Sequence, residues 1–331
     1  MKNFTYYRPQ TAEEAVGLLD DKWGTSELLA GGTDLLDLQK EYIAQPDKVI
    51  SLSGVKGLSG IDTNGERVVI QAGTKLAEIA EHPELRKLYP GLTSAAQEIG
   101  GPQIRNMGTL GGNLCQRNRC WYFRDEPTVC LLKGGERCYA IDGENRYHAI
   151  FWQGHKCVIV NPSTLAPVLI ALGAEVSTVA AGGGRKLPID QFFQGPSSAT
   201  EREHVLKPNE LVVSVSIPKS GARNASYEVR HKQAYDWPLV QAGVAFAYED
   251  NKASKVRIVL GHVAPMPRVA EEAAKALEGK EVTEETAAAA GKAAAEGAKP
   301  LSQNAYKVKL VEVAVKRAAL TAAGQKRYWE A

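Results

Sequence analysis

The hydrophobic and polar positions of the chain follow two periods, which predict strands and helices mixed along its whole length. Alternation with period two, bounded by turn residues, predicts strands at residues 47–55, 67–74 and 210–218. Spacing of three to four predicts helices at residues 11–21, 75–100 and 304–324. The second of these helices is expected to break near Pro90. Thr11 with Glu14 three positions later forms a capping box, which predicts where the first helix begins.

The pattern changes from about Ser226, where a separate unit is expected to begin. Strands are predicted at residues 225–231, 239–249 and 255–264. Two helices follow them, an alanine-rich one near Glu284 to Glu296 and the helix at 304–324. Strands followed by helices are typical of an α+β unit.

Two glycine turns each lead into an apolar run with helical spacing. The first is AGGTDLLDLQK at residues 30–40, and the second is NMGTLGGNL at residues 106–114. Backbone N–H groups at a helix start lack partners and attract anions, and glycine lets an anion approach closely. Taken singly, each glycine pair is most simply an ordinary turn. Two such turns suit a ligand with two phosphates, while neither matches the Rossmann or P-loop glycine motif.

Composition and charge narrow the class of protein. A chain of 331 residues suits two or three domains, and a formal net charge of +2 gives no reason to expect nucleic acid or an anionic membrane as partner. No apolar run approaches the roughly 20 residues that span a bilayer. Because the N-terminal stretch has no apolar signal core, the chain by its own sequence is expected to be cytoplasmic, although a partner could carry it elsewhere.

All five cysteines lie between Cys115 and Cys157, which indicates a shared local role. Four thiolates could hold a [4Fe–4S] cluster, and scattered cysteines could equally be unlinked buried thiols. The odd count and the missing signal peptide count against disulfides, and the absence of a C-x-x-C pair counts against a zinc ribbon. His148 and His155 lie in the same segment and are expected at surface loop positions rather than in catalysis.

Three stretches, LLAGGTDLL, MGTLGGNLCQRNRCWYF and NPSTLAPVLIALGA, resemble the FAD-binding subunit of the molybdenum hydroxylases, the xanthine dehydrogenase family. The resemblance covers nearly the whole chain. It implies an α+β protein with a vanillyl-alcohol-oxidase-type (PCMH-type) FAD-binding domain of two subdomains and a C-terminal α+β domain. The implied boundaries are 1–55, 56–222 with an iron–sulfur insertion at about 115–158, and 223–331.

The same resemblance implies which residues bind FAD. The backbone of the first turn would hold the diphosphate, with contacts from Leu28, Leu29, Ala30, Gly31, Gly32, Thr33, Asp34 and Leu35. The second turn would contribute Thr109, Gly112 and Asn113, and the flavin would lie beside Ile99 and Gly100. Many members have Ser-Asp where this chain has Ser163-Thr164, so Thr164 is expected to make a weaker contact in place of that aspartate.

Most flavin subunits of the family lack the cysteine segment. The chain is similar to two branches that have it, the flavin subunits of 4-hydroxybenzoyl-CoA reductase and of periplasmic aldehyde oxidoreductases, in which inserted cysteines bind a [4Fe–4S] cluster. The stretches GGNLCQRNRCWYF and GENRYHAIFWQGHKC are closer to the aldehyde-oxidoreductase branch. The implied ligands are Cys120, Cys130, Cys138 and Cys157, and Cys115 would be a packed thiol.

The function that the resemblance implies is an electron-transfer subunit of a heterotrimeric molybdenum-containing oxidoreductase, expected to act on aldehydes. A large subunit would carry the molybdenum cofactor, a small subunit the [2Fe–2S] clusters, and this chain would pass electrons through FAD to an external acceptor. The chain would be periplasmic if it were exported with a partner carrying a twin-arginine signal. A self-contained flavoenzyme of the same domain type and a non-catalytic metal-binding scaffold are the alternatives. No general base or nucleophile stands out, which fits a relay.

Overall fold

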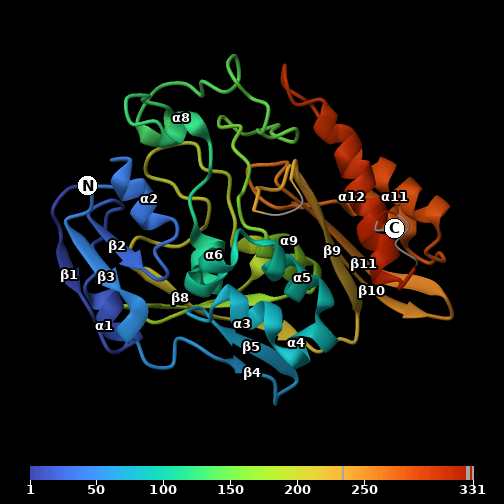
Figure 1. The fold of residues 1–331 in the computed structure, drawn as a ribbon, viewed down its shortest axis with the longest axis horizontal. Coiled ribbons are helices and arrows are strands. Elements are labelled where there is room, and N and C mark those ends of the chain that lie inside the picture. Colours follow the sequence, from blue (N-terminus) through green and yellow to red (C-terminus); the bar gives the residue numbers. More distant parts are fainter. Residues whose placement is uncertain (233–234, 326–328, 330–331) are drawn as a thin grey trace.

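The computed structural model describes residues 1–232, 235–325 and 329 and arranges them as three β-sheets with helices beside and between them (Figure 1). The end of the expected C-terminal unit, at residues 326–328 and 330–331, lies outside the described residues. Among the described residues, no helix combines the length and the apolar character that crossing a bilayer requires.

The first sheet has three parallel strands in the order β1 (Thr5–Tyr7), β3 (Lys48–Ser51) and β2 (Ser26–Leu29). Parallel neighbours need crossover connections, which α1 (Ala12–Gly17) and α2 (Leu35–Lys40) supply. Thr11 caps α1 as the sequence predicts, since its side chain accepts a hydrogen bond from the Glu14 backbone N–H at 3.1 Å. Strand β2 ends where the first glycine turn begins.

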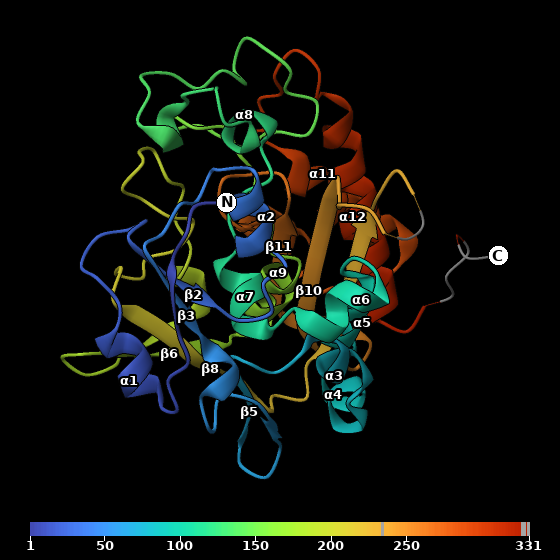
Figure 2. The same cartoon turned by 60° about the vertical axis from the view of Figure 1, so that its left-hand side comes forward.

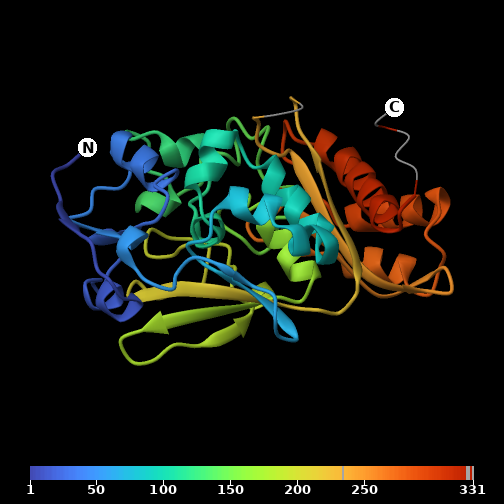
Figure 3. The ribbon, with the colours of Figure 1, turned by 60° about the horizontal axis from the view of Figure 1, so that its bottom comes forward.

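The second sheet has five strands in the order β4 (Ile61–Asp62), β5 (Arg67–Gln71), β8 (Glu210–Pro218), β6 (Glu175–Ala180) and β7 (Lys186–Pro188). All its neighbouring strands are antiparallel. Figure 3 shows a layer of helices on one side of this sheet. They are α3 (Leu76–Glu81), α4 (Pro83–Leu88), α5 (Pro90–Glu98), α6 (Pro102–Met107), α7 (Leu110–Cys115) and α9 (Leu165–Ala171). The single helix predicted over residues 75–100 is therefore three helices.

Two prolines explain this division. Pro83 and Pro90 each occupy the first turn of a new helix, where a missing N–H has no cost, and neither can continue the helix before it. The break near Pro90 is predicted from the sequence, whereas the break at Pro83 is not. The first and second sheets share one hydrophobic core, which includes Ile50 from the first, Val68 and Val215 from the second, and Val16 from α1.

The third sheet is antiparallel, in the order β12 (Arg268–Val269), β11 (Lys252–Gly261), β10 (Val240–Glu249) and β9 (Arg223–Val229). Helices α10 (Glu271–Leu277), α11 (Glu284–Ala295) and α12 (Tyr306–Ala322) cover one face and enclose a core of their own. In Figure 1 this sheet separates α11 and α12 (red) from the rest of the molecule. The three predicted strands and two predicted helices are present, and α10 was not predicted.

The cysteine segment between α7 and α9 is mostly irregular, as its lack of periodicity predicts. It contains the short helix α8 (Trp121–Arg124) and one 3-10 turn at Leu131–Lys133. A separate small core, built from Leu38, Phe123, Cys130, Leu132, Cys157 and Ile159, holds it to α2. Figure 2 shows the segment (green) as a set of loops above α2 and α7.

Candidate cofactor site

The two glycine turns lie against each other. A Cβ atom built on Gly31 would lie 1.9 Å from the Met107 carbonyl oxygen, so the backbone of the first turn touches the residue that enters the second. Gly32 has a φ of +76°, a left-handed conformation that favours glycine. The two turns border one cleft of about 410 Å³, within the size range of small-molecule sites.

The second turn is fixed by the strand that precedes it. The Gly111 N–H donates to the Ala72 carbonyl at 2.8 Å and the Leu110 N–H donates to the Thr74 carbonyl at 3.0 Å. Thr109 caps α7, because its hydroxyl oxygen accepts a hydrogen bond from the Gly112 N–H at 3.1 Å. These bonds engage the N–H groups of Gly111 and Gly112, and both glycines line the cleft.

The structure brings most of the predicted FAD contacts into this cleft. The predicted residues that line it are Leu28, Ala30, Gly31, Gly32, Thr33, Asp34, Leu35, Thr109 and Gly112. The predicted residues that do not line it are Leu29, Ile99, Gly100, Asn113 and Thr164. The Asn113 side chain instead accepts from the Ser163 hydroxyl at 2.7 Å, and the Thr164 carbonyl accepts from the Gln241 side chain at 2.8 Å.

Asp34 has a role that its position in the glycine turn does not reveal. Its carboxylate accepts hydrogen bonds from the Arg119 and Arg124 guanidinium groups and, at 2.8 Å, from the Arg117 backbone N–H. Burial alone would raise the pKa of Asp34, but the two guanidinium groups outweigh it and hold the pKa below its usual value. The side chain of Asp34 therefore binds the first glycine turn to the cysteine segment.

Further charged and polar residues line the same cleft, and four of them are considered next. They are Glu27, Arg117, Arg202 and His204. Arg202 stacks over the Trp23 ring at 4.6 Å, and burial lowers the pKa of His204 to about 4. Burial likewise raises the pKa of Glu27. Glu27 and Arg117 lie next to the two glycine turns along the chain, whereas Arg202 and His204 lie in a distant segment that neither turn motif covers.

The four predicted cluster ligands line one small cavity. Cys120, Cys130, Cys138 and Cys157 meet there, and every other residue that lines it is apolar or aromatic. Cys115 lines the glycine-turn cleft instead. Phe123 lines both the cleft and the cavity, so one aromatic side chain lies between them.

Backbone N–H groups distinguish these four sulfurs from the fifth. Burial raises the pKa of Cys120 to about 12, and the N–H groups of Phe123 and Tyr122 oppose this rise. Backbone N–H groups act in the same way on Cys130, Cys138 and Cys157. A hydrogen bond from Cys157 lowers the pKa of Cys138 to about 6. The pKa of Cys115 is raised to about 12 by burial, with no opposing group.

His148 is buried, which makes the expected surface position wrong. Its side chain lies beside the cavity with Nε2 at 3.1 Å from Cys120 Sγ. His155, the other histidine of the segment, is partly exposed. Among the described residues, no three His, Cys, Asp or Glu side chains form a group that could hold a single metal ion.

Comparison with known proteins identifies the family of this chain. The family model described as the FAD binding domain in molybdopterin dehydrogenase matches residues 2–220. The chain belongs to the molybdenum hydroxylase FAD-binding subunits. The CO dehydrogenase flavoprotein C-terminal domain matches residues 225–322 of this FAD-binding subunit. The predicted fold class is confirmed, and so is the prediction of a subunit of a molybdenum hydroxylase-type oxidoreductase.

Relatives of this FAD-binding subunit match it over almost their full length. The aldehyde oxidoreductase FAD-binding subunit PaoB of Escherichia coli (strain K12) is 32% identical, over 94% of this chain and 96% of its own. The carbon monoxide dehydrogenase medium chain of Hydrogenophaga pseudoflava is 30% identical over 95% of each chain. The solved carbon monoxide dehydrogenase of that organism, lacking the Mo-pyranopterin moiety, superimposes with a TM-score of 0.76 at 29% identity over 97% of each chain.

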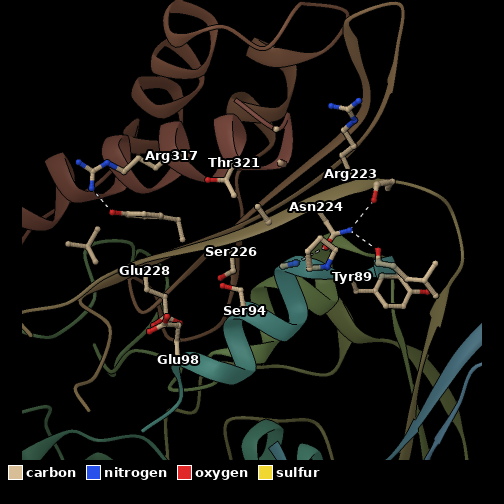
Figure 4. Close-up of a pocket in the computed structure, with 18 of the residues that line it drawn as sticks. Tyr89, Ser94, Glu98, Arg223, Asn224, Ser226, Glu228, Arg317 and Thr321 are labelled. Carbon is tan, nitrogen blue, oxygen red and sulfur yellow. Dashed lines mark hydrogen bonds between the residues drawn. The ribbon is translucent and has the colours of Figure 1, made fainter. Parts of the chain in front are cut away.

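A second cleft of this FAD-binding subunit lies between α5, β9 and α12 and has a volume of about 990 Å³. Figure 4 shows the carboxyl groups of Glu98 and Glu228 pointing toward each other on its wall. Both Glu228 oxygens are buried, and neither has a hydrogen-bond partner in the part of the chain that the structure describes. Burial raises the pKa of Glu228 to about 8, Glu98 adds to the rise, and Arg230 opposes it.

Asp34→Asn is expected to lower the free energy of unfolding by about 2 kcal/mol, because two largely buried guanidinium groups lose their counter-charge. Asp37→Asn is the matched control, since Asp37 also accepts from Arg124 but its side chain is 56% exposed. It should cost less than about 1 kcal/mol. Urea unfolding followed by circular dichroism measures both, and equal losses would show that the Asp34 cluster contributes nothing special.

Glu228→Gln is expected to remove a pH dependence of stability. The folded state keeps the Glu228 proton up to about pH 8, whereas the unfolded chain releases it near the ordinary value of 4.5. The unfolded state thus binds fewer protons between these values, so the wild type loses stability as pH rises through this window. Urea unfolding at pH 5 and pH 8 should show a smaller loss for Glu228→Gln than for the wild type. The exposed Glu285→Gln serves as control and should behave as the wild type does.

Proposed function

We propose that this chain is the FAD and [4Fe–4S] electron-transfer subunit of a heterotrimeric molybdenum-containing oxidoreductase that acts on aldehydes. Electrons would arrive from a subunit with the molybdenum cofactor through a small subunit with [2Fe–2S] clusters and leave to an external acceptor. The observation that carries this proposal is the gathering of four cysteines in a cavity that shares Phe123 with the glycine-turn cleft.

The glycine-turn cleft is the proposed FAD site. The backbone of Gly31, Gly32 and Thr33 would hold the diphosphate together with Thr109 and Gly112, because an anion can approach glycine backbone closely. The Thr109 hydroxyl accepts from Gly112, which leaves its own hydrogen free to donate. Asn113 would support the turn through its bond to Ser163. Ile99 and Gly100 beside the flavin and the weaker contact from Thr164 are part of the same proposal.

The cysteine cavity fits an iron–sulfur cluster by the chemistry of its donors. Four sulfurs face a space with no competing charged side chain, and backbone N–H groups act on each thiol pKa in the direction opposite to burial. A four-iron cluster keeps its cysteine sulfurs further apart than a single ion does, so a spacing unsuited to one ion is compatible with a cluster. Cys115 lies outside this donor set and is proposed as a packed thiol.

When bound, FAD exchanges electrons singly or in pairs, while a [4Fe–4S] cluster exchanges one at a time. The residues of this chain hold the two sites next to each other. Phe123 forms part of both walls, and Arg117 stacks over its ring at 4.7 Å. The apolar and aromatic lining of the cysteine cavity keeps water from it.

The aldehyde class rests on the relative that is named as an aldehyde oxidoreductase FAD-binding subunit. Its match over 94% of this chain favours that chemistry. We propose domain boundaries at 1–55, 56–222 and 223–331, with the iron–sulfur insertion at about 115–158. We also propose a cytoplasmic location on the chain's own sequence. The location would be periplasmic if a partner with a twin-arginine signal exported the complex.

In the purified complex, Cys130→Ser is expected to abolish the iron–sulfur absorption that comes from this subunit and to leave the flavin bands unchanged. Iron content per complex should fall by the four atoms of one cluster. Cys115→Ser is the matched control and should keep both chromophores, because Cys115 lies outside the cavity. Flavin without this iron in the wild type would favour a self-contained flavoenzyme, and neither chromophore would favour a scaffold.

Gly31→Ala is expected to release FAD. The new methyl group would meet the Met107 carbonyl at 1.9 Å, so the two turns must separate, at a cost of about 1–3 kcal/mol. Gly17→Ala is the control, because nothing lies within 4 Å of its added Cβ. The ratio of flavin to protein absorbance after gel filtration measures the effect. Full flavin retention in Gly31→Ala would rule out this turn as the diphosphate site.

A further inference from the structure

The side chain of His148 lies next to the cysteine cavity without being part of its wall. Its Nε2 atom is 3.1 Å from Cys120 Sγ, and the residue is only 4% exposed. Among the described residues, the other side-chain hydrogen bond to the four sulfurs is the one between Cys138 and Cys157. Cys120 is thus distinguished from the other three sulfurs by a histidine.

Two backbone hydrogen bonds and one ring contact fix His148. The His148 backbone N–H donates to the Asn145 carbonyl at 3.0 Å, and the Asn304 side chain donates to the His148 backbone carbonyl at 3.1 Å. The Trp121 ring meets the imidazole edge to face at 5.7 Å between centroids. Both asparagines are completely buried, so this geometry does not depend on mobile surface groups.

The direction of the hydrogen bond between His148 and Cys120 is fixed once iron is bound. An iron-bound cysteine sulfur carries no hydrogen and can only accept, so Nε2 must carry the proton and donate. The other ring nitrogen, Nδ1, is buried without a partner among the described residues, which leaves it as the unprotonated nitrogen. The imidazole therefore acts as a neutral donor toward Cys120.

We propose that the His148 Nε2–H donates a hydrogen bond to Cys120 Sγ of a [4Fe–4S] cluster and thereby raises the reduction potential of that cluster. The inference rests on the proposed cluster site. Reduction adds one electron, and part of its charge falls on the cysteine sulfurs. A hydrogen bond to an anionic acceptor strengthens as the negative charge grows, so His148 stabilises the reduced state more than the oxidised one.

The test uses the intact purified complex and electron paramagnetic resonance during a redox titration. His148→Phe keeps the ring volume and removes the donor, and the equilibrium constant for one-electron reduction should fall about tenfold, which corresponds to about 59 mV. His148→Gln retains an N–H donor and should remain close to the wild type. His155→Phe removes the other histidine of the segment and should leave the potential unchanged.

A second measurement detects the contact between the cluster and the histidine nitrogen directly. In wild-type complex labelled with ¹⁵N-histidine, pulsed electron paramagnetic resonance of the reduced cluster should show a weak nitrogen coupling. The coupling should vanish in His148→Phe. If that variant loses its iron, the coupling in the labelled wild type decides alone.

The outcomes separate the two proposals. Wild-type complex without this cluster in iron analysis would overturn the proposed cluster and the role of His148 together. A cluster that is present, with an unchanged potential in His148→Phe or without a histidine nitrogen coupling, would overturn the role of His148 alone. A lower potential in His148→Phe that His148→Gln restores supports it, because a purely structural role would not distinguish the two by their donor.

Discussion

The carboxylate of Asp34 is the interaction on which the arrangement of both sites depends. It follows the first glycine turn directly and accepts hydrogen bonds from three residues of the cysteine segment, Arg117, Arg119 and Arg124. Because the side chain is largely buried, the charge is worth more here than on the surface. It fixes an irregular segment, which has few backbone ladders of its own, against the turn that borders the cleft.

Close packing adds a second constraint. Gly31 permits the first turn to touch the backbone at Met107, and any side chain there would force the turns apart. Phe123, four residues beyond Arg119, can then reach both the cleft and the cysteine cavity. One charged cluster and one glycine contact thus bring the first glycine turn against the cysteine segment, which lies more than eighty residues further along the chain.

Local sequence patterns predict many of the strands and both glycine turns. Contacts between residues that lie far apart in the sequence could not be predicted in this way. Period-two alternation found the long strands β10 and β11, and the turn residues of 30–33 and 108–112 marked both sides of the cleft. The role of the Asp34 side chain could not be predicted, because its arginine partners lie 83 to 90 positions away and carry no periodic signal. The burial of His148 could not be predicted for the same reason, since Asn304, its buried partner, lies 156 positions further along the chain.

The C-terminal unit contributes to the cysteine segment as well as to its own core. Residues just before and within the first turn of α12 hold residues 145–149 by hydrogen bonds. Asn304 donates to three carbonyls there, and the buried Lys307 ammonium donates to the Tyr147 carbonyl at 2.8 Å. A loop with little secondary structure otherwise leaves its carbonyls unpaired, and burial would make that costly. By satisfying them from a neighbouring sheet-and-helix unit, the chain holds the His148 ring against Cys120. A change at the start of α12 would therefore reach the cysteine cavity without touching any of its sulfurs.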